Sequence, residues 1–446
     1  MRHKKRLLLP TLPLLVCLLL LAACDLAANN SSNTAATATA GLPTPANTPD
    51  LAAEVTTPIP LIPSQNVLTI TVWTVPEISP RSEIPGGPTM LEQFNAYDTS
   101  HPDLHLFVEL KTVADQGGML SYLRTGRGVA PKVLPDLVLL PANQLAGAVA
   151  DGLIYPLTDL PLDPTIYNDL FPAAQDLAAI NGINYGYPIA LTNLHHLAYN
   201  ANVITSTIPS RWSSFITVPN GQFVFPAAGP AGAELALQFY LANGGTLTST
   251  DGKPNLDISP LTIALERINQ GVAAGFIWPG SGSIGTVETG WQALQSELPN
   301  ITMATADLSL RQRALGSAPA YSTIPGEIAP FSPLVNAWVW AISTPDPARQ
   351  VLAAELISWL ATPQNLAEWS YQSQRVPAQR SAFAAWPSAN NAFVTFLRGQ
   401  AEVAQPFPAG ANTAIISALT AAVNSVVNQT STPQAAAELA AQAVRQ

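Results

Sequence analysis

Apolar and polar positions from residue 67 onward follow the periods of strands and helices. The segment 67–73, Val-Leu-Thr-Ile-Thr-Val-Trp, alternates and is rich in β-branched residues, which predicts a strand. The segment 89–100 predicts a helix, 102–110 a second strand, and the wholly apolar 135–140 a strand covered on both faces. Strands that alternate with helices predict an α/β fold with mainly parallel sheets. Ligands of such sheets bind beyond the carboxyl ends of the strands, which here are the loops after Trp73 and Leu140.

The first 24 residues have a different pattern. Arg2, Lys4, Lys5 and Arg6 precede an apolar run, 7–21, which contains two prolines and is shorter than the ~20 residues of a membrane span. This order predicts a secretory signal, 1–23, that is removed, although an uncleaved membrane anchor is an alternative. The ending Leu21-Ala22-Ala23-Cys24 resembles the lipobox of bacterial lipoproteins. That resemblance implies lipidation of Cys24 and an extracytoplasmic protein that is anchored to the cell membrane by its lipid.

Between the signal and the first strand, residues 25–65 are rich in Asn, Ser, Thr and Pro and almost free of aromatic residues. Such a composition cannot bury enough apolar surface to order itself. We therefore expect 24–65 to be the lipidated cysteine and a disordered linker. A coil of about 40 residues reaches roughly 35 to 40 Å, which suits a tether.

Charge and cysteine content narrow the function further. Four of the 19 Lys and Arg leave with the signal, so the mature chain carries 15 positive and 29 negative residues, a net charge of −14. This balance argues against nucleic acid as a partner. Cys17 also leaves, so the exported domain has no disulfide and no thiolate metal site. About 380 residues remain after the linker, enough for two lobes that each bury a core.

The order of segments from 67 to the C-terminus resembles the family 1 extracellular solute-binding proteins, the carbohydrate-type receptors of ABC importers. No single segment is specific, whereas their order and spacing over nearly 400 residues are. The segments that carry the resemblance are the strand ending at Trp73, Pro135-Asp136-Leu137-Val138, Ala150-Asp151-Gly152-Leu153-Ile154-Tyr155-Pro156-Leu157, Tyr187-Pro188-Ile189-Ala190, Tyr199-Asn200, Trp212, Leu241-Ala242-Asn243-Gly244-Gly245, Asp251-Gly252-Lys253-Pro254, Trp338-Val339-Trp340-Ala341-Ile342-Ser343 and Pro433-Gln434-Ala435-Ala436-Ala437.

The resemblance implies a two-lobe periplasmic-binding-protein-like fold with a solute held between the lobes. The N-terminal lobe would be 66–187 plus 305–342, and the C-terminal lobe 188–304 plus 343–446. Chain crossings would fall near 187–192, near 303–309 and near Ser343. The implied activity is binding of a sugar or related solute and its delivery to ABC permease subunits by hinge closure. We expect a monomer without catalysis, cofactor or metal.

Aromatic faces and neutral or acidic side chains are the groups that recognise sugars. The resemblance and the predicted strand ends together give thirteen candidate solute-binding residues. They are Trp73, Thr74, Glu77, Asn143, Gln144, Thr192, Asn193, Gly232, Glu234, Asp307, Ser309, Asn336 and Trp338.

Each candidate has a structural alternative. Trp73 and Trp338 lie in apolar runs and could be core residues, while Asn143 and Gln144 could cap the next helix. Glu77 and Asp307 could be solvated loop acids. The chain also departs from the maltose-type pattern, since 227–234 has no aromatic residue and Ser309 replaces a tryptophan of that pattern. These departures argue against a maltodextrin as the solute, while a different sugar, a polyol or a sugar phosphate stays open. Few Lys and Arg residues lie near these loops, which argues against a strongly anionic solute.

An exported enzyme is the main alternative class, and a sensor lipoprotein is another. His195-His196 is the only histidine pair, but it lacks metal-binding spacing, so a structural pair is favoured. Gly280-Ser281-Gly282-Ser283-Ile284-Gly285 lacks the Lys-Ser or Lys-Thr of a phosphate loop, which favours a surface loop. A carboxylate pair for glycoside hydrolysis is set by spatial distance, so among 29 acids the sequence leaves this alternative open.

Overall fold

A computed structural model describes residues 67–113, 117–163, 165–296 and 299–445. The predicted signal, Cys24 and the linker 24–65 lie outside these ranges. Within them, no helix is both long enough and apolar enough to cross a membrane.

The first sheet has six strands, in the order β12-β11-β3-β1-β2, with β6 also paired to β11. The strands β1, β2 and β3 are parallel, and β11 runs antiparallel to β3 and β6. The four elements predicted at 67–73, 89–100, 102–110 and 135–140 are confirmed as β1, α1, β2 and β3. The bounds of the strands are β1 Leu68–Thr74, β2 Leu104–Leu110, β3 Leu137–Pro141, β6 Tyr187–Thr192, β11 Leu334–Ile342 and β12 Gln405–Pro406.

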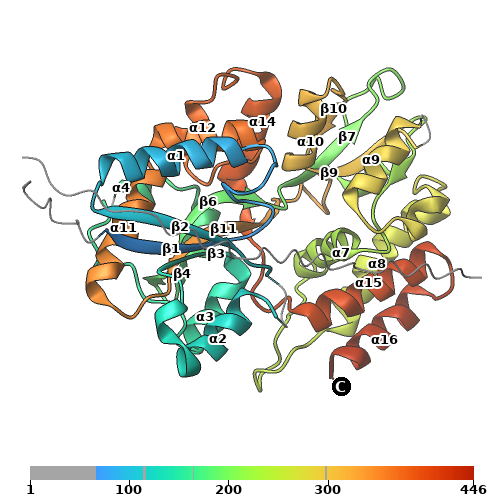
Figure 1. Ribbon diagram of the computed structural model, residues 1–446. Coiled ribbons are helices and arrows are strands. Elements are labelled where there is room, and N and C mark those ends of the chain that lie inside the picture. The colour runs from blue at the N-terminus through green and yellow to red at the C-terminus, as the bar shows by residue number, and fades with distance from the viewer. Residues whose placement is uncertain (1–66, 114–116, 164, 297–298, 446) are drawn as a thin grey trace, which may run out of the picture. The chain divides into compact units, whose positions relative to one another are not determined.

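Helices cover both faces of the first sheet, with α1 and α12 on one side and α2 and α3 on the other (Figure 1). All four residues from Leu137 to Leu140 in β3 are fully buried, as the apolar pattern predicts for a doubly covered strand. The helices that accompany this sheet are α1 Gly87–Ser100, α2 Met119–Val129, α3 Leu145–Ala150, α4 Thr165–Asn168, α5 Pro172–Ala178, α11 Pro347–Leu360, α12 Pro363–Ser373, α13 Arg380–Ala384 and α14 Ala392–Val403, with the short hairpin β4 Ala179–Ile180 and β5 Ile183–Asn184.

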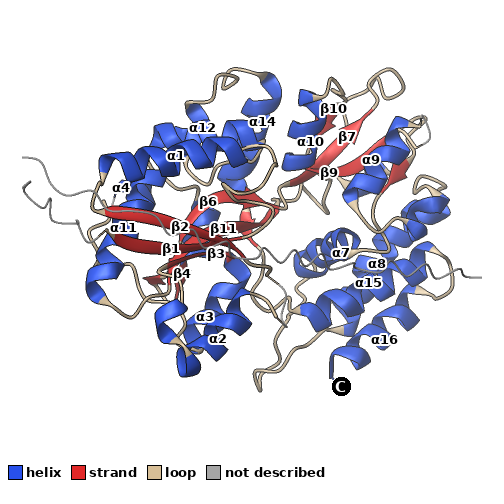
Figure 2. Cartoon of the chain, viewed as in Figure 1, coloured by secondary structure: helices blue, strands red, loops and turns tan. Residues whose placement is uncertain are grey.

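The second sheet has four strands in the order β10-β7-β9-β8, again with accompanying helices (Figure 2). Its strands are β7 His195–Tyr199, β8 Phe223–Val224, β9 Ile301–Thr305 and β10 Ala320–Ser322. The remaining helices are α6 Trp212–Phe215, α7 Pro230–Ala242, α8 Ile258–Ala273, α9 Val287–Gln295, α10 Ala306–Ala314, α15 Thr413–Val427 and α16 Pro433–Arg445, and the 3₁₀ turns are η1 Pro131–Val133, η2 Ala142–Gln144 and η3 Pro279–Ser283.

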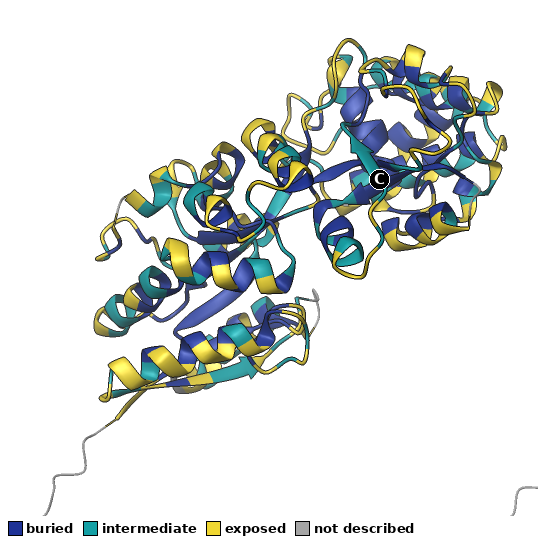
Figure 3. Cartoon of the chain, turned by 90° about the horizontal axis from the view of Figure 1, so that it is seen from above, coloured by how far each residue is buried: buried dark blue, intermediate teal, exposed yellow. Residues whose placement is uncertain are grey.

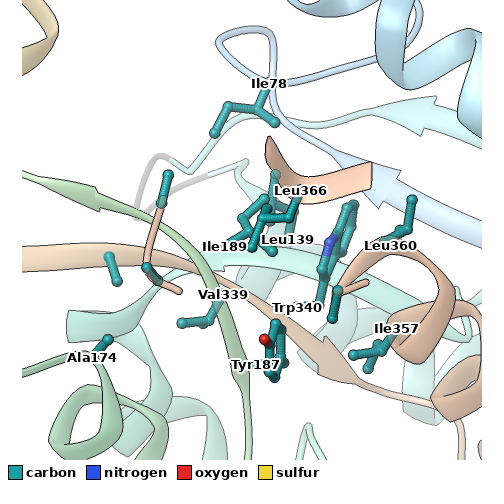
Figure 4. Packing of buried hydrophobic residues seen from close by; sticks show 14 of the residues in the cluster. Ile78, Leu139, Ala174, Tyr187, Ile189, Val339, Trp340, Ile357, Leu360 and Leu366 are labelled. Carbon is teal, nitrogen blue, oxygen red and sulfur yellow. The ribbon is translucent and has the colours of Figure 1, made fainter. Parts of the chain in front are cut away.

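Two large hydrophobic clusters form separate cores, one around each sheet. In both, buried strands lie among helices that are exposed on their outer sides (Figure 3). The side chains of Trp340 and Tyr187 lie in the first core, near Ile357 and Leu360 of α11 (Figure 4). The sequence thus encodes two core-bearing units.

The cores divide the chain differently from the expected lobes at residues 343–404. We expected 343–446 in the C-terminal lobe, yet α11, α12, α13 and α14 all contribute side chains to the first core, up to Ala404. The reason is local, because α11 follows β11 after a short turn and packs back on the same sheet. Asp346 caps α11, its carboxylate accepting the Ala348 N–H at 2.9 Å, and Pro347 starts the helix.

The chain passes from one core to the other at short intervals. It does so between Leu194 and Leu197, between Met303 and Ala306, between Leu310 and Ile324, and between Leu334 and Val335. The first two passages lie close to the expected crossings. The passage expected at Ser343 lies earlier, at the start of β11, and the buried hydroxyl of Ser343 donates to Pro135 O at 2.9 Å within the first unit. A further passage follows Ala404.

Candidate functional site

One edge of the first sheet gathers nine of the thirteen candidates. The strands β1 and β3 are parallel, so Trp73, Thr74 and the residues after Pro141 lie at the same edge. The first half of β11 lies at this edge too, because β11 is antiparallel to β3 and β6 and its Trp338 pairs with Pro141 at the end of β3 and with Ala190 of β6. We call this edge, with the loops that leave it, the polar edge. Its candidates are Trp73, Thr74, Glu77, Asn143, Gln144, Thr192, Asn193, Asn336 and Trp338.

The two tryptophans at the polar edge differ in exposure. Trp73 is only 4% exposed and belongs to the first core, and its indole Nε1 has no hydrogen-bond partner. Its ring packs edge-on with Tyr122, with centroids 6.5 Å apart, and Lys111 Nζ lies 4.8 Å from its centroid. Trp338 is partly exposed and packs against the first core. Trp73 therefore has a core role with one unsatisfied donor, whereas Trp338 keeps surface beyond the core.

The loop after β1 is fixed by a buried hydroxyl pair and an arginine. Thr74 is fully buried, and its hydroxyl donates to Ser79 Oγ at 2.9 Å. Glu77 is exposed, and its backbone carbonyl accepts from Arg375 Nη2 at 3.1 Å. Thr74 thus holds the loop, while the Glu77 carboxylate faces solvent.

Two amides follow β3. Asn143 is exposed, and Gln144 is partly buried, with its Nε2 donating to Val113 O at 3.1 Å. The Gln144 Oε1 atom is buried without a partner. Gln144 is the N-cap residue of α3 but makes no side-chain capping bond, so the capping alternative is not observed for it. Gln144 instead ties the end of β3 to the loop after β2.

Three further polar residues lie where β6 meets β11. Thr192 and Asn336 are paired across the two strands, and both are partly exposed. Asn193 is exposed and has a φ of 63°, a left-handed conformation that asparagine tolerates better than most residues. Together with Asn143 and Gln144, these residues give the polar edge four neutral amides.

Asp307 lies near the start of α10 and pairs with Arg375. Its Oδ2 accepts from Arg375 Nη1 at 3.2 Å, while Oδ1 is buried without a partner. Burial raises the pKa of the Asp307 carboxyl above its usual range, against the opposing charge of Arg375. Because the same Arg375 bonds Glu77 O, it joins α10 to the loop after β1.

The remaining three candidates make their contacts within the fold, which differs from the expected contact with solute. Glu234 is 4% exposed, and its carboxylate lies 2.9 Å from His195 Nδ1. Ser309 is 1% exposed, and its hydroxyl lies 2.9 Å from His196 Nε2. Gly232 is buried in α7, where an added Cβ would come within 2.4 Å of Pro226 O. The backbone N–H of Gly232 donates to Gly229 O within the fold, whereas the sequence predicted that it would donate to a solute.

Both histidines of the pair are buried, and each has a side-chain partner within the fold, Glu234 for His195 and Ser309 for His196. Burial lowers the pKa of His196 to about 3, so this ring is neutral in the folded protein at physiological pH. Its ring packs against Phe393 and Phe396 of α14. Throughout the described ranges, no group of three or more His, Cys, Asp or Glu side chains is arranged to hold a metal ion.

Sequence reasoning missed several residues that the fold brings to the polar edge. Tyr122 is half exposed beside Trp73, and Lys111 and Glu109 form an ion pair of 2.9 Å next to it. Arg375 comes from a distant part of the chain, after α12. Lys111 and Glu109 at the end of the predicted second strand could have been found by the rule that led to Trp73, whereas Arg375 had no local signal.

Comparisons with known proteins give one family and many structural relatives. The family described as "Bacterial extracellular solute-binding protein" matches residues 108–395. A comparison with curated proteins gives no match.

Solved structures share the fold at low identity. The GacH receptor of Streptomyces glaucescens, solved unliganded and with acarbose, is 15% identical, with a TM-score of 0.63 over 84% of this chain and 97% of that one. The cyclic alpha-maltosyl-1,6-maltose binding protein of Arthrobacter globiformis is 15% identical, with a TM-score of 0.67 over 84% and 98%. The maltose/maltodextrin-binding domain of Bdellovibrio bacteriovorus, bound to maltotriose, is 18% identical, with a TM-score of 0.61 over 85% and 99%. These likenesses confirm the predicted two-lobe α/β fold.

Proposed function

The chain belongs to the bacterial extracellular solute-binding protein family, and from this premise we propose that its solute is a neutral, hydroxyl-rich molecule of the sugar class. We propose further that the polar edge is the part of the first lobe that contacts the solute. The residues expected to do so are Asn143, Asn193, Asn336 and Trp338, with Thr192 and Gln144 beside them.

The observation that carries this proposal is the neutral character of the polar edge. Two cations near it are paired with carboxylates, Lys111 with Glu109 at 2.9 Å and Arg375 with Asp307 at 3.2 Å. A third, Arg81, donates to Val108 O at 2.8 Å and lies in the same loop as the oppositely charged Glu77. An anionic solute would have to compete with Glu109 for Lys111 or with Asp307 for Arg375. Amide groups, by contrast, donate and accept hydrogen bonds without a net charge, which suits hydroxyl groups.

Three unsatisfied polar atoms among the candidates support the same class of solute. The indole N–H of Trp73 is a donor, and Gln144 Oε1 and Asp307 Oδ1 are acceptors. A buried polar atom without a partner costs about 1–3 kcal/mol, so a solute or a water molecule that satisfies it is favoured. Hydroxyl groups can serve both kinds of atom. The structural relatives that bind acarbose and maltotriose are consistent with this chemistry.

Delivery to a membrane transporter completes the proposal. We expect the two lobes to close on the solute by a hinge motion, and the closed form to dock on ABC permease subunits. The predicted lipid at Cys24 would hold the receptor at the membrane and raise its local concentration there.

A screen of thermal unfolding tests the proposed solute class. The purified chain without residues 1–23 is heated with neutral sugars, polyols, sugar phosphates, amino acids and polyamines. A ligand at a hundred times its dissociation constant adds about 2.7 kcal/mol to the free energy of unfolding, so a neutral sugar should raise the midpoint. A rise with amino acids or anions alone would contradict the proposal. Hydrolysis of a glycoside during the assay would favour the alternative of an exported glycoside hydrolase.

A further inference from the structure

A half-exposed tyrosine lies beside an ion pair at the polar edge. Tyr122 keeps 50% of its surface exposed, and its ring packs edge-on with Trp73. Lys111 Nζ lies 4.8 Å from the Trp73 centroid and 5.4 Å from the Tyr122 centroid. Glu109 Oε2 lies 2.9 Å from the same nitrogen. The four side chains form what we call the aromatic–ion cluster: Trp73, Glu109, Lys111 and Tyr122.

Backbone hydrogen bonds hold this cluster against the polar edge. The Lys111 N–H donates to Thr74 O at 2.8 Å, which fixes the end of β2 beside the end of β1. The Met119 N–H donates to Thr112 O at 2.8 Å, so α2 and Tyr122 in its first turn are fixed to the same loop. Gln144 Nε2 donates to Val113 O and ties the loop to the end of β3. The cluster is therefore held in place before any solute arrives.

The groups in the cluster match the two kinds of surface that a sugar ring presents. An aromatic ring covers the apolar C–H face of a sugar, and Tyr122 is the cluster's exposed aromatic side chain. The Lys111 ammonium donates hydrogen bonds and the Glu109 carboxylate accepts them, so together they can bond neighbouring hydroxyls. Their charges cancel, which favours a neutral ring over an anionic group. Both side chains keep part of their surface accessible, 25% for Lys111 and 34% for Glu109.

We infer that Tyr122, Lys111 and Glu109 form a binding subsite for one neutral sugar ring of the solute. The inference rests on the proposed function, because it assigns a further contact to the same polar edge. Trp73 supports the subsite by packing against Tyr122 and Lys111. The residues Asn143 and Trp338, which the sequence had singled out, would then contact other parts of the solute.

Calorimetric titration of variants tests the subsite. The chain without residues 1–23 is titrated with glucose, maltose, maltotriose and a wider panel of neutral saccharides, and the one bound most tightly is then titrated into the variants. Tyr122→Ala should weaken binding about tenfold, which corresponds to about 1.4 kcal/mol, because it removes the ring and the apolar area that the ring covers on the sugar. Tyr122→Phe keeps the ring and should stay within about threefold of the wild type. Lys111→Met removes the donors and should weaken binding several-fold.

The chain offers a matched control. Tyr155 is also paired with a cation, since Arg127 lies 5.5 Å from its centroid, but it bridges Ile342 at the opposite end of β11. Tyr155→Ala should leave the affinity unchanged. Circular dichroism checks that each variant is folded, and Lys111→Met carries the test if Tyr122→Ala does not fold.

The outcomes separate the two proposals. A wild-type chain that binds no neutral saccharide overturns the proposed solute class, and the subsite with it. A wild-type chain that binds a saccharide, with folded Tyr122→Ala and Lys111→Met binding it equally well, overturns the subsite alone. A Tyr155→Ala variant that loses as much affinity as Tyr122→Ala also overturns it, because the effect would then not be specific to the polar edge.

Discussion

Removing the carboxylate of Asp136 should destabilise the first unit by about 3 kcal/mol. Asp136 is 2% exposed and lies just before β3. Its two oxygens accept from Arg349 Nε and Nη2, each at 2.6 Å, and Oδ2 also accepts the Thr71 N–H at 2.8 Å. Arg349 Nη2 donates in addition to Thr69 O at 2.6 Å. One carboxylate thus joins β1, the start of β3 and α11.

The magnitude follows from the groups that Asp136→Ala would leave unpaired. Breaking a buried ion pair by removing one partner costs about 3–5 kcal/mol. Arg349 is 26% exposed, so water can recover part of its solvation, which places the expected loss near the lower end. The double variant Asp136→Leu with Arg349→Met removes both charges and should regain much of that loss.

Urea unfolding at pH 7, followed by tryptophan fluorescence, measures the effect. The matched control is Asp151→Ala, because the Asp151–Arg124 pair has the same chemistry but its side chains are 40% and 48% exposed. The control should lose less than about 1 kcal/mol. A loss for Asp136→Ala no larger than that of Asp151→Ala would refute the reasoning that this bidentate pair holds the unit together.

Three further predictions concern buried and edge residues. Burial holds the pKa of His196 at about 3 in the folded protein, against 6.5 in the unfolded chain, so the free energy of unfolding should fall by about 1.4 kcal/mol per pH unit between pH 6.5 and about pH 3. His196→Gln should lack this dependence of the free energy of unfolding on pH, measured by urea unfolding at pH 7, 5 and 4. The same dependence in both proteins would count against a buried neutral ring. Glu234→Ala should lower the free energy of unfolding by about 1–3 kcal/mol by leaving His195 without its partner; Glu234→Gln keeps an acceptor and should lose less, so equal losses would indicate that charge matters more than the hydrogen bond. Trp338→Ala should weaken saccharide binding in calorimetry with the thermal midpoint nearly unchanged, and unfolding of the variant would instead assign Trp338 to the core.

Local patterns predicted three of the six strands of the first sheet, β1, β2 and β3, because each of them has its own local signal. The alternation at 67–73 and the apolar run at 135–140 correspond to β1 and to the fully buried β3. The rule about the carboxyl ends of strands then gave Trp73, Asn143 and Gln144 a common edge. That edge follows from chain direction alone, so it needs no knowledge of long-range contacts.

The sequence did not predict the partners of several buried polar residues, because these partners are set by long-range packing. Glu234 is of a residue type that often binds ligands, yet its carboxylate contacts His195, which lies 39 positions away in the chain. Ser309 meets His196 across 113 positions, and Arg375 meets Asp307 across 68. The helices between 347 and 403 likewise carry no local sign of which core they join. Partners at such separations are set by the tertiary fold, which periodicity and local composition do not encode.

We propose that this receptor binds a neutral sugar without altering it. Titration calorimetry of the chain without residues 1–23 against neutral saccharides, with the sugar recovered afterwards and analysed, tests this most directly. We expect saturable binding of one saccharide per chain, weaker binding by the Asn143→Ala variant, and recovery of the intact sugar. Absence of binding to every neutral saccharide, together with saturable binding of an amino acid or an anion, would contradict it.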